Sequence, residues 1–245
     1  MTTKAYINRT YRSLLSDNKL ETFHVAVRET DLLVRAERSL ARETRDLVLK
    51  HRLPLERYIQ DHPDFVEHLN PVLPDRLAPP IIRTMIEASR KAGVGPMAGV
   101  AGAVAEYVGR DLLAYSNEVV IENGGDIFIR TTFPLVVAIF AGASPLSGKV
   151  GVRVDPRGTP VAVCTSSATV GHSLSFGKAD AAVAIATAAS LADAAATAIG
   201  NSVSSKADIG AAIDVGKNIE GVKGIVVILD SKIGVWGEVE LIGIT

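Results

Sequence analysis

The sequence predicts an α+β protein whose antiparallel sheets are covered by helices on one face. The main observation is that the order of strands, then two helices, then strands occurs twice along the chain, and this order is typical of antiparallel sheets with segregated helices. A second observation excludes a Rossmann domain: strands and helices do not alternate regularly, and no glycine fingerprint follows the first strand. The repeats divide the 245 residues into halves, 1–145 and 146–245, which we expect to form one compact domain.

The first half begins with strand-like alternation and continues with amphipathic helices. Apolar residues alternate across Glu21–Glu37, which indicates extended structure. Arg38–Tyr58 has helical spacing with a break expected at Pro54, and Gly93 is expected to end the next helix. The run Asn123-Gly124-Gly125 is a strong tight-turn signal. The expected strands are Ala5–Tyr11, those within Glu21–Glu37, Glu118–Glu122, Asp126–Thr132 and Pro134–Ala141, and the expected helices are Arg38–Tyr58, Pro79–Lys91 and Pro96–Arg110.

The second half repeats this plan more compactly. Turns are expected at Asp155-Pro156-Arg157-Gly158 and at Asp230–Ile233, because these stretches are rich in residues that favour turns. The expected strands are Val150–Val154, Pro160–Thr165, Ala179–Ala186, Gly224–Leu229 and Gly234–Ile242, and the expected helices are Ser190–Val203 and Lys206–Asn218.

Composition excludes several classes of protein. Hydrophobic residues make up 47% and charged residues 22%, and 26 basic against 27 acidic residues leave a net charge of −1. This balance argues against a nucleic-acid-binding protein. The single cysteine, Cys164, excludes an internal disulfide and a cysteine-cluster metal site, and its apolar neighbours favour a buried thiol over a nucleophile. Because we find neither a signal peptide nor an apolar stretch long enough to span a membrane, we expect a cytoplasmic protein.

Two segments are rich in small residues that permit close packing. Gly99, Gly102 and Ala103 form one thin face of the helix Pro96–Arg110, and more than half of Ala179–Gly200 is alanine. Within the alanine-rich segment, Asp193 and Thr197 are one helical turn apart and share a face.

Asp193 and Thr197 allow two interpretations. A carboxylate and a hydroxyl that converge on a bare surface suit magnesium, which takes oxygen ligands and usually shares them with a phosphate. The alternative is purely structural. Ser190 caps the helix in a capping box with Asp193, and Thr197 bonds back to the carbonyl four residues earlier.

Three stretches, in order, resemble the ApbE superfamily, and most closely its cytoplasmic branch in anaerobic bacteria and archaea. They are Pro96-Met97-Ala98-Gly99-Val100-Ala101-Gly102-Ala103-Val104-Ala105-Glu106, then Glu122-Asn123-Gly124-Gly125-Asp126-Ile127, then Ala192-Asp193-Ala194-Ala195-Ala196-Thr197-Ala198. The resemblance covers residues 95–245 well and the amino-terminal third loosely. It implies two tandem tunnelling-fold-like (T-fold) units, in agreement with the repeated plan.

The resemblance also implies an activity. Flavin transferases of this superfamily bind FAD and magnesium and move FMN onto a threonine or serine of a target flavoprotein, with release of AMP, and some relatives hydrolyse FAD. Such chemistry at phosphorus relies on metal charge and positioning. By this resemblance Asp193 and Thr197 ligate magnesium, and Asn123, Gly124, Gly125 and Asp126 lie near the flavin nucleotide. For the turn, the alternative is a simple hairpin.

Several positions depart from the family pattern. The family's lysine-glycine pair is Ala101-Gly102 here, and its aspartate four residues on is Glu106. The threonine-serine-glycine-aspartate-tyrosine motif is reduced to Thr165-Ser166-Ser167, and the histidine-x-x-aspartate-proline segment is missing. By position, Gly102, Glu106, Thr165 and Ser166 remain candidate cofactor-binding residues.

The segment Gly171–Asp180 occupies the region where that histidine motif is expected. Its small residues, hydroxyls and charges suit a phosphate, with His172 as a candidate acid, base or anion donor and Lys178, Ser173 and Ser175 as phosphate contacts. Asp180 is a turn residue or a second carboxylate beside Asp193. The alternative for the whole segment is a solvated serine-glycine loop.

Three functions therefore remain open. The first is a magnesium-dependent enzyme that transfers FMN from FAD or hydrolyses FAD. The second is a non-catalytic protein that binds a flavin or another phosphate-bearing small molecule. The third is an oligomeric structural protein, in which the strand Gly234–Ile242, with Trp236, is an exposed edge that pairs between subunits. A homo-oligomer is expected.

Overall fold

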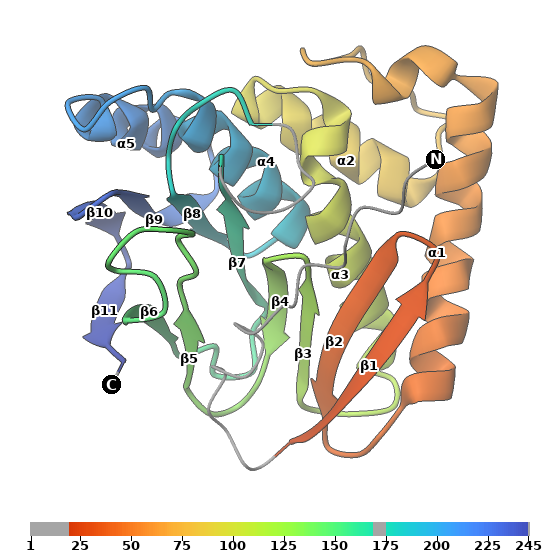
Figure 1. The fold of residues 1–245 in the computed structure, drawn as a ribbon. Coiled ribbons are helices and arrows are strands. Elements are labelled where there is room, and N and C mark those ends of the chain that lie inside the picture. The colour runs from red at the N-terminus through yellow and green to blue at the C-terminus, as the bar shows by residue number, and fades with distance from the viewer. Residues whose placement is uncertain (1–19, 169–174, 245) are drawn as a thin grey trace.

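The computed structural model describes residues 20–168 and 175–244, and its largest element is an antiparallel sheet of eight strands (Figure 1). The strand order is β1-β2-β3-β4-β7-β8-β9-β10, and every neighbouring pair is antiparallel. The strands are β1 Glu21–Val27, β2 Thr30–Ala36, β3 Val119–Asn123, β4 Asp126–Arg130, β7 Val161–Ser166, β8 Ala181–Ala186, β9 Val222–Leu229 and β10 Lys232–Gly237.

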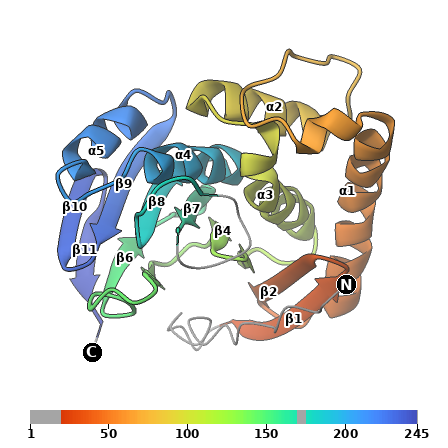
Figure 2. The same ribbon diagram turned by 45° about the horizontal axis from the view of Figure 1, so that its top comes forward.

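Helices cover one face of this sheet. Figure 2 shows α3, α4 and α5 side by side over the strands, with α1 beyond them against β1. Helix α2 packs on α3 and α4 rather than on the sheet. The helices are α1 Ala41–Asp61, α2 Pro80–Ala92, α3 Val100–Leu112, α4 Ala189–Asn201 and α5 Ile209–Lys217, with short 3₁₀ turns η2 Pro63–Val66 and η3 Pro96–Gly99. The predicted α+β class, with antiparallel strands and helices on one face, is confirmed.

A second sheet of three strands, in the order β11-β6-β5, accompanies the large sheet. Its strands are β5 Leu135–Ala138, β6 Val150–Val154 and β11 Glu240–Gly243. Val137 and Val152 of the small sheet share one buried apolar cluster with Val163, Val183 and Val226 of the large sheet. The large sheet is therefore buried on both faces over β4 and β7–β9.

The large sheet spans the boundary between the predicted halves. Strands β1–β4 come from residues 1–145, β7–β10 come from residues 146–245, and the two sets join where β4 pairs with β7. Two tandem units with this connection remain a prediction. Among the described residues, no helix is both long and apolar enough to cross a membrane.

Two predictions about elements were wrong. Helix α1 continues through Pro54, and the carbonyl that the proline leaves without its helical N–H belongs to Lys50, an exposed residue. The predicted strand Gly234–Ile242 is two strands, because Gly237 has φ +83° and turns the chain from the large sheet into the small one. The predicted strand Ala5–Tyr11 lies outside the described residues.

Helix α3 approaches the sheet so closely at Gly109 that an added methyl group has no room. A Cβ built there would lie 2.3 Å from Cδ1 of fully buried Phe128. We expect Gly109→Ala to lower the free energy of unfolding by about 2 kcal/mol, although alanine is the better helix former. The matched control is Gly210→Ala in α5, where nothing lies within 4 Å and about 0.5–1 kcal/mol of stabilisation is expected. Urea denaturation measures both, and equal effects would contradict the close packing of α3.

Candidate functional site

The hairpin between β3 and β4 places polar side chains beneath the helices. Gly124 and Gly125 have φ values of +70° and +109°, as a two-residue hairpin turn with two positive φ angles requires. Asn123 therefore pairs directly with Asp126, and Asp126 pairs in turn with Cys164 of β7. These three residues form one row across neighbouring strands on one face of the sheet.

Helix α4 meets α3 and the preceding 3₁₀ turn η3 above this row, at Gly102 of α3 and Gly99 of η3. A Cβ at Gly99 would lie 2.9 Å from the carbonyl oxygen of Ser190, and a Cβ at Gly102 would lie 2.2 Å from that of Ala189. The close-packing face predicted from these glycines is confirmed. The approach lets the Gly102 N–H donate a 2.9 Å hydrogen bond to Oδ2 of Asp193.

The capping interpretation of Ser190 and Asp193 is wrong. Helix α4 begins at Ala189 with no side-chain cap, so Ser190 lies inside its first turn. The N–H and hydroxyl of Ser190 both donate to Oε2 of buried Glu106, each at 3.3 Å, and Oε1 of Glu106 pairs with Arg110 at 2.7 Å. Glu106 therefore ties the start of α4 to α3, and the Asp193 carboxylate remains directed at the α3 backbone.

The Asp193 carboxylate is half-buried between α3 and α4. Burial raises the pKa of Asp193 from its ordinary value to about 7, and the backbone N–H groups of Gly102 and Ala101 oppose that rise. Burial likewise raises the pKa of Asp126 well above its ordinary value, and repulsion from Asp193 adds to the rise. The two carboxylates thus lie close together, and the charge of Asp193 disfavours that of buried Asp126.

Cys164 lies next to both carboxylates and is fully buried, as the sequence predicts. Its thiol donates to the carbonyl oxygen of Ala189 at 3.4 Å. Burial raises the pKa of the Cys164 thiol, and repulsion from Asp126 and Asp193 raises it further. A thiol held in its protonated form is a poor nucleophile, which agrees with the non-nucleophilic role expected from the sequence.

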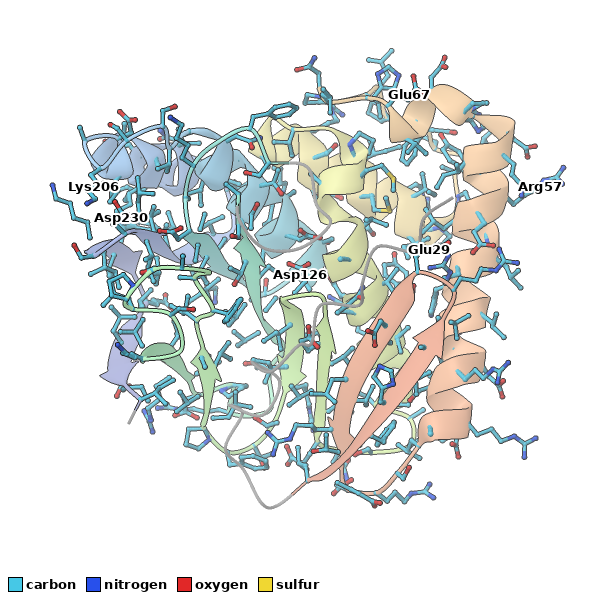
Figure 3. All side chains as sticks on the ribbon, in the orientation of Figure 1. Glu29, Arg57, Glu67, Asp126, Lys206 and Asp230 are labelled. Carbon is cyan, nitrogen blue, oxygen red and sulfur yellow. The ribbon has the colours of Figure 1, made fainter. Side chains whose placement is uncertain are left out.

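Two buried oxygens in this region have no hydrogen-bond partner. They are Oδ1 of Asp126, whose side chain is labelled in Figure 3, and Oγ of Ser166, two residues beyond Cys164 on β7. Ser166 lies beside Gly200 near the carboxyl end of α4. Thr197 is also mostly buried on α4, between Asp193 and Gly200.

The turn glycines and Thr165 adjoin this row. Asn123 Nδ2 donates to the carbonyl of Ala101 at 3.0 Å, which joins the hairpin to α3. The N–H of Gly125 donates to Oε1 of Glu122, and a Cβ at Gly125 would lie 3.7 Å from the carbonyl oxygen of Thr165. The structure thus brings together the candidates from all three family-like stretches.

The loop before β8 is placed only in part. His172 and Ser173 lie outside the described residues. Ser175 is half-buried and Lys178 is exposed, and the Lys178 N–H donates to the carbonyl of Val203 just after α4. Asp180 does not lie beside Asp193, because its Oδ2 accepts from the N–H of Asp230 and holds the β9–β10 turn.

The second carboxylate beside Asp193 is Asp126, which the sequence did not predict for this position. The sequence assigned it to the flavin side and offered Asp180 as the neighbour of Asp193. The pairing of β4 with β7 brings Asp126 under α4, and no local pattern reveals that pairing. Among the described residues, no group of three histidine, cysteine or acidic side chains is arranged to hold a metal.

Comparisons with known proteins agree with this architecture. A family model described as "AbpE bacteria" matches residues 12–241. The UPF0280 protein MJ1526 of Methanocaldococcus jannaschii is 39% identical over 221 residues, which are 88% of this chain and 90% of that protein. A UPF0280 protein of Methanosphaerula palustris is 43% identical over 218 residues, again 88% and 90% of the two chains. The apo crystal structure of Pseudomonas stutzeri flavinyl transferase ApbE is similar at a TM-score of 0.55 and 14% identity, with 89% of this chain and 94% of that chain covered, and so shares the fold.

The buried acidic pair should make the metal-free protein less stable as pH rises. The folded-state pKa of Asp193 is about 7, above its value in the unfolded chain, so the folded protein holds the extra proton between about pH 4 and pH 7. The stability that this proton contributes is fully present below the window and is lost as pH rises through it, at about 1.4 kcal/mol per pH unit.

Unfolding by urea in EDTA at pH 5, 6, 7 and 8 measures this loss. Asp193→Asn cannot ionise, so the difference in stability between it and wild type should change across the window. Parallel pH profiles for the two proteins would show that Asp193 does not titrate in this way.

Proposed function

This chain belongs to the ApbE-like family whose bacterial model it matches, and on that premise we propose that it binds a flavin nucleotide together with magnesium and acts on its phosphate linkage. Asp193 and Thr197 would hold the cation, and Asp126 would lie beside it. The observation that carries this proposal is the pair of carboxylates formed by buried Asp126 and half-buried Asp193, with one oxygen of Asp126 unpartnered.

The residues present fit a divalent cation. Two neighbouring carboxylates whose pKa values are both raised are costly to ionise without a counter-charge. The described partners of Asp193 are backbone N–H groups, and Asp126 Oδ1 has no hydrogen bond at all. A magnesium ion would supply the missing positive charge and take oxygen ligands of this kind.

The protein's own groups would position the nucleotide. The Gly102 N–H holds the Asp193 carboxylate, and Glu106 holds the helix that carries it. The turn glycines Gly124 and Gly125 have no side chains, so a planar or phosphate group could approach the backbone next to Asp126. Bound magnesium supplies charge stabilisation and orientation for substitution at phosphorus. The remaining phosphate contacts would come from Thr165, Ser166, Ser175 and Lys178. His172 and Ser173, which lie outside the described residues, are further candidates.

A reaction at this site would transfer the FMN half of FAD. A hydroxyl oxygen, from a threonine or serine of a target flavoprotein or from water, would form a bond to the phosphorus of that half. The bond from this phosphorus to the bridging oxygen would break, and AMP would leave. The proton of the attacking hydroxyl would pass to solvent or to a nearby base.

A second candidate function is flavin binding without transfer. Glu106 stands where the family has an aspartate, and both of its carboxylate oxygens are engaged by Ser190 and Arg110. Ala101 stands where the family has a lysine and offers only backbone groups. Fewer groups are therefore available for catalysis than in a flavin transferase.

Isothermal titration tests the cation site directly. With FAD present, Asp193→Asn should weaken magnesium binding about tenfold or more, because it removes a charged ligand. Thr197→Val keeps the shape of the side chain and should weaken binding as well. The matched control is Ser202→Ala, since the hydroxyl of Ser202, the C-cap of the same helix, donates to the carbonyl of Ala198 in its last turn. Unchanged magnesium affinity in both site variants would remove the proposed role.

Product analysis separates the two candidate functions. Incubation with FAD and magnesium should release AMP, and Asp193→Asn should abolish the release without loss of the fold. Chromatography of the mixture detects AMP and FMN, and mass spectrometry of an added flavoprotein detects attached FMN. Tight FAD binding with no AMP would contradict the transfer reaction and favour the binding protein.

A further inference from the structure

Strand β10 is an open edge of the large sheet. It lies at the opposite side of the molecule from α1 (Figures 1 and 2), and it pairs with β9 on one side. In the described part of the chain no strand pairs with its other side. Unpaired N–H and C=O groups along such an edge are a template for a further strand.

The β9–β10 ladder determines which backbone groups of β10 face outward. The N–H of Glu238 donates to the carbonyl of Lys223 at 2.8 Å, in line with the register of the ladder. Because bonded and non-bonded pairs alternate in antiparallel ladders, the even-numbered residues of β10 direct their backbone groups to β9. The odd-numbered residues, Ile233, Val235 and Gly237, direct theirs to the open edge.

Among the outward-facing residues of β10, two have both a backbone N–H and a C=O that no described residue bonds. Gly237 has φ +83°, and its carbonyl already accepts from the N–H of Val239 at 2.9 Å. Ile233 and Val235 each keep an outward N–H and an outward C=O. The free edge is therefore centred on Gly234.

The side chains of these two residues are also unusually exposed for their type. Ile233 is 39% and Val235 is 40% exposed. They lie on the face opposite α5, because Gly234 between them packs against Ile209 of that helix. From Ile233 to Gly237 the strand carries neither a charge nor a proline, which are common devices for blocking an edge.

We propose that β10 pairs with β10 of a second copy of this chain, antiparallel about a two-fold axis at Gly234. Ile233 of one copy then lies opposite Val235 of the other, and each such pair exchanges two backbone hydrogen bonds. The two pairs satisfy all the outward groups of Ile233 and Val235 in both copies. The large sheet becomes continuous across the dimer.

Self-complementarity favours a second copy over a foreign strand. The same register that satisfies the backbone also stacks the exposed Ile233 and Val235 side chains on one face of the sheet. On the other face it sets Lys232 opposite Trp236, whose ring already has Lys217 Nζ of its own chain 5.9 Å from its centroid. Gly234 meets Gly234 at the closest position of the ladder, where Cα atoms are about 4.5 Å apart. This proposal does not depend on the cation site.

Sedimentation velocity over a range of protein concentrations tests the interface. The wild-type chain should be a dimer, and Val235→Lys or Ile233→Lys should raise the dimer dissociation constant about tenfold or more, since each adds charge to an apolar pairing surface. Both side chains are exposed, so circular dichroism should show an unchanged fold. The matched control, Leu53→Lys on α1, changes a side chain that is 56% exposed far from β10 and should remain dimeric.

Hydrogen exchange tests the register. Amides of Ile233 and Val235 should exchange more slowly as the dimer fraction rises, whereas the amide of Gly237 should not. A monomer at every concentration would overturn the proposal. So would a dimer that survives both β10 substitutions, or a different protein that copurifies on this edge.

Discussion

The hydrogen bond from the Gly102 N–H to the Asp193 carboxylate joins the two helices on which the site depends. It forms only because glycines at 99 and 102 let the backbones of α3 and α4 come within contact distance. Glu106 secures the same interface one turn further along, where it accepts from Ser190. The alanine-rich composition of α4 follows from this geometry, since larger side chains would separate the helix from both α3 and the sheet.

The sheet beneath the helices supplies the second half of the site. The tight Gly124-Gly125 turn sets Asn123 opposite Asp126, and β7 adds Cys164 to the row. Asp126 is thereby buried close to Asp193, and repulsion from Asp193 disfavours its charge. A folded protein retains such an arrangement at a cost in stability, and costs of this kind are common where a ligand restores the balance. In the proposed function the acidic pair is the centre of the site, and the surrounding helices and strands hold it in place.

Local patterns in the sequence predicted much of this architecture and some of its chemistry. Glycine pairs, helix-ending Gly93 and alternating apolar residues located most elements, because these signals act over a few neighbouring residues. The sequence predicted close packing at Gly102 and metal binding at Asp193, but not the contact between them, since the two residues are 91 positions apart. The role of Asp180 and the division at Gly237 were not predicted, because each depends on strand pairing across the sheet. Pro54 shows the reverse case, in which a local signal for a helix break is present and the helix nevertheless continues.

Anomalous diffraction from crystals soaked in manganese and FAD tests the central claim most directly, because manganese replaces magnesium at oxygen ligands and marks its own position. The account predicts a single strong peak within bonding distance of Asp193 Oδ and Thr197 Oγ1, on the side of Asp126. A peak elsewhere, or no peak while FAD is bound, would contradict it.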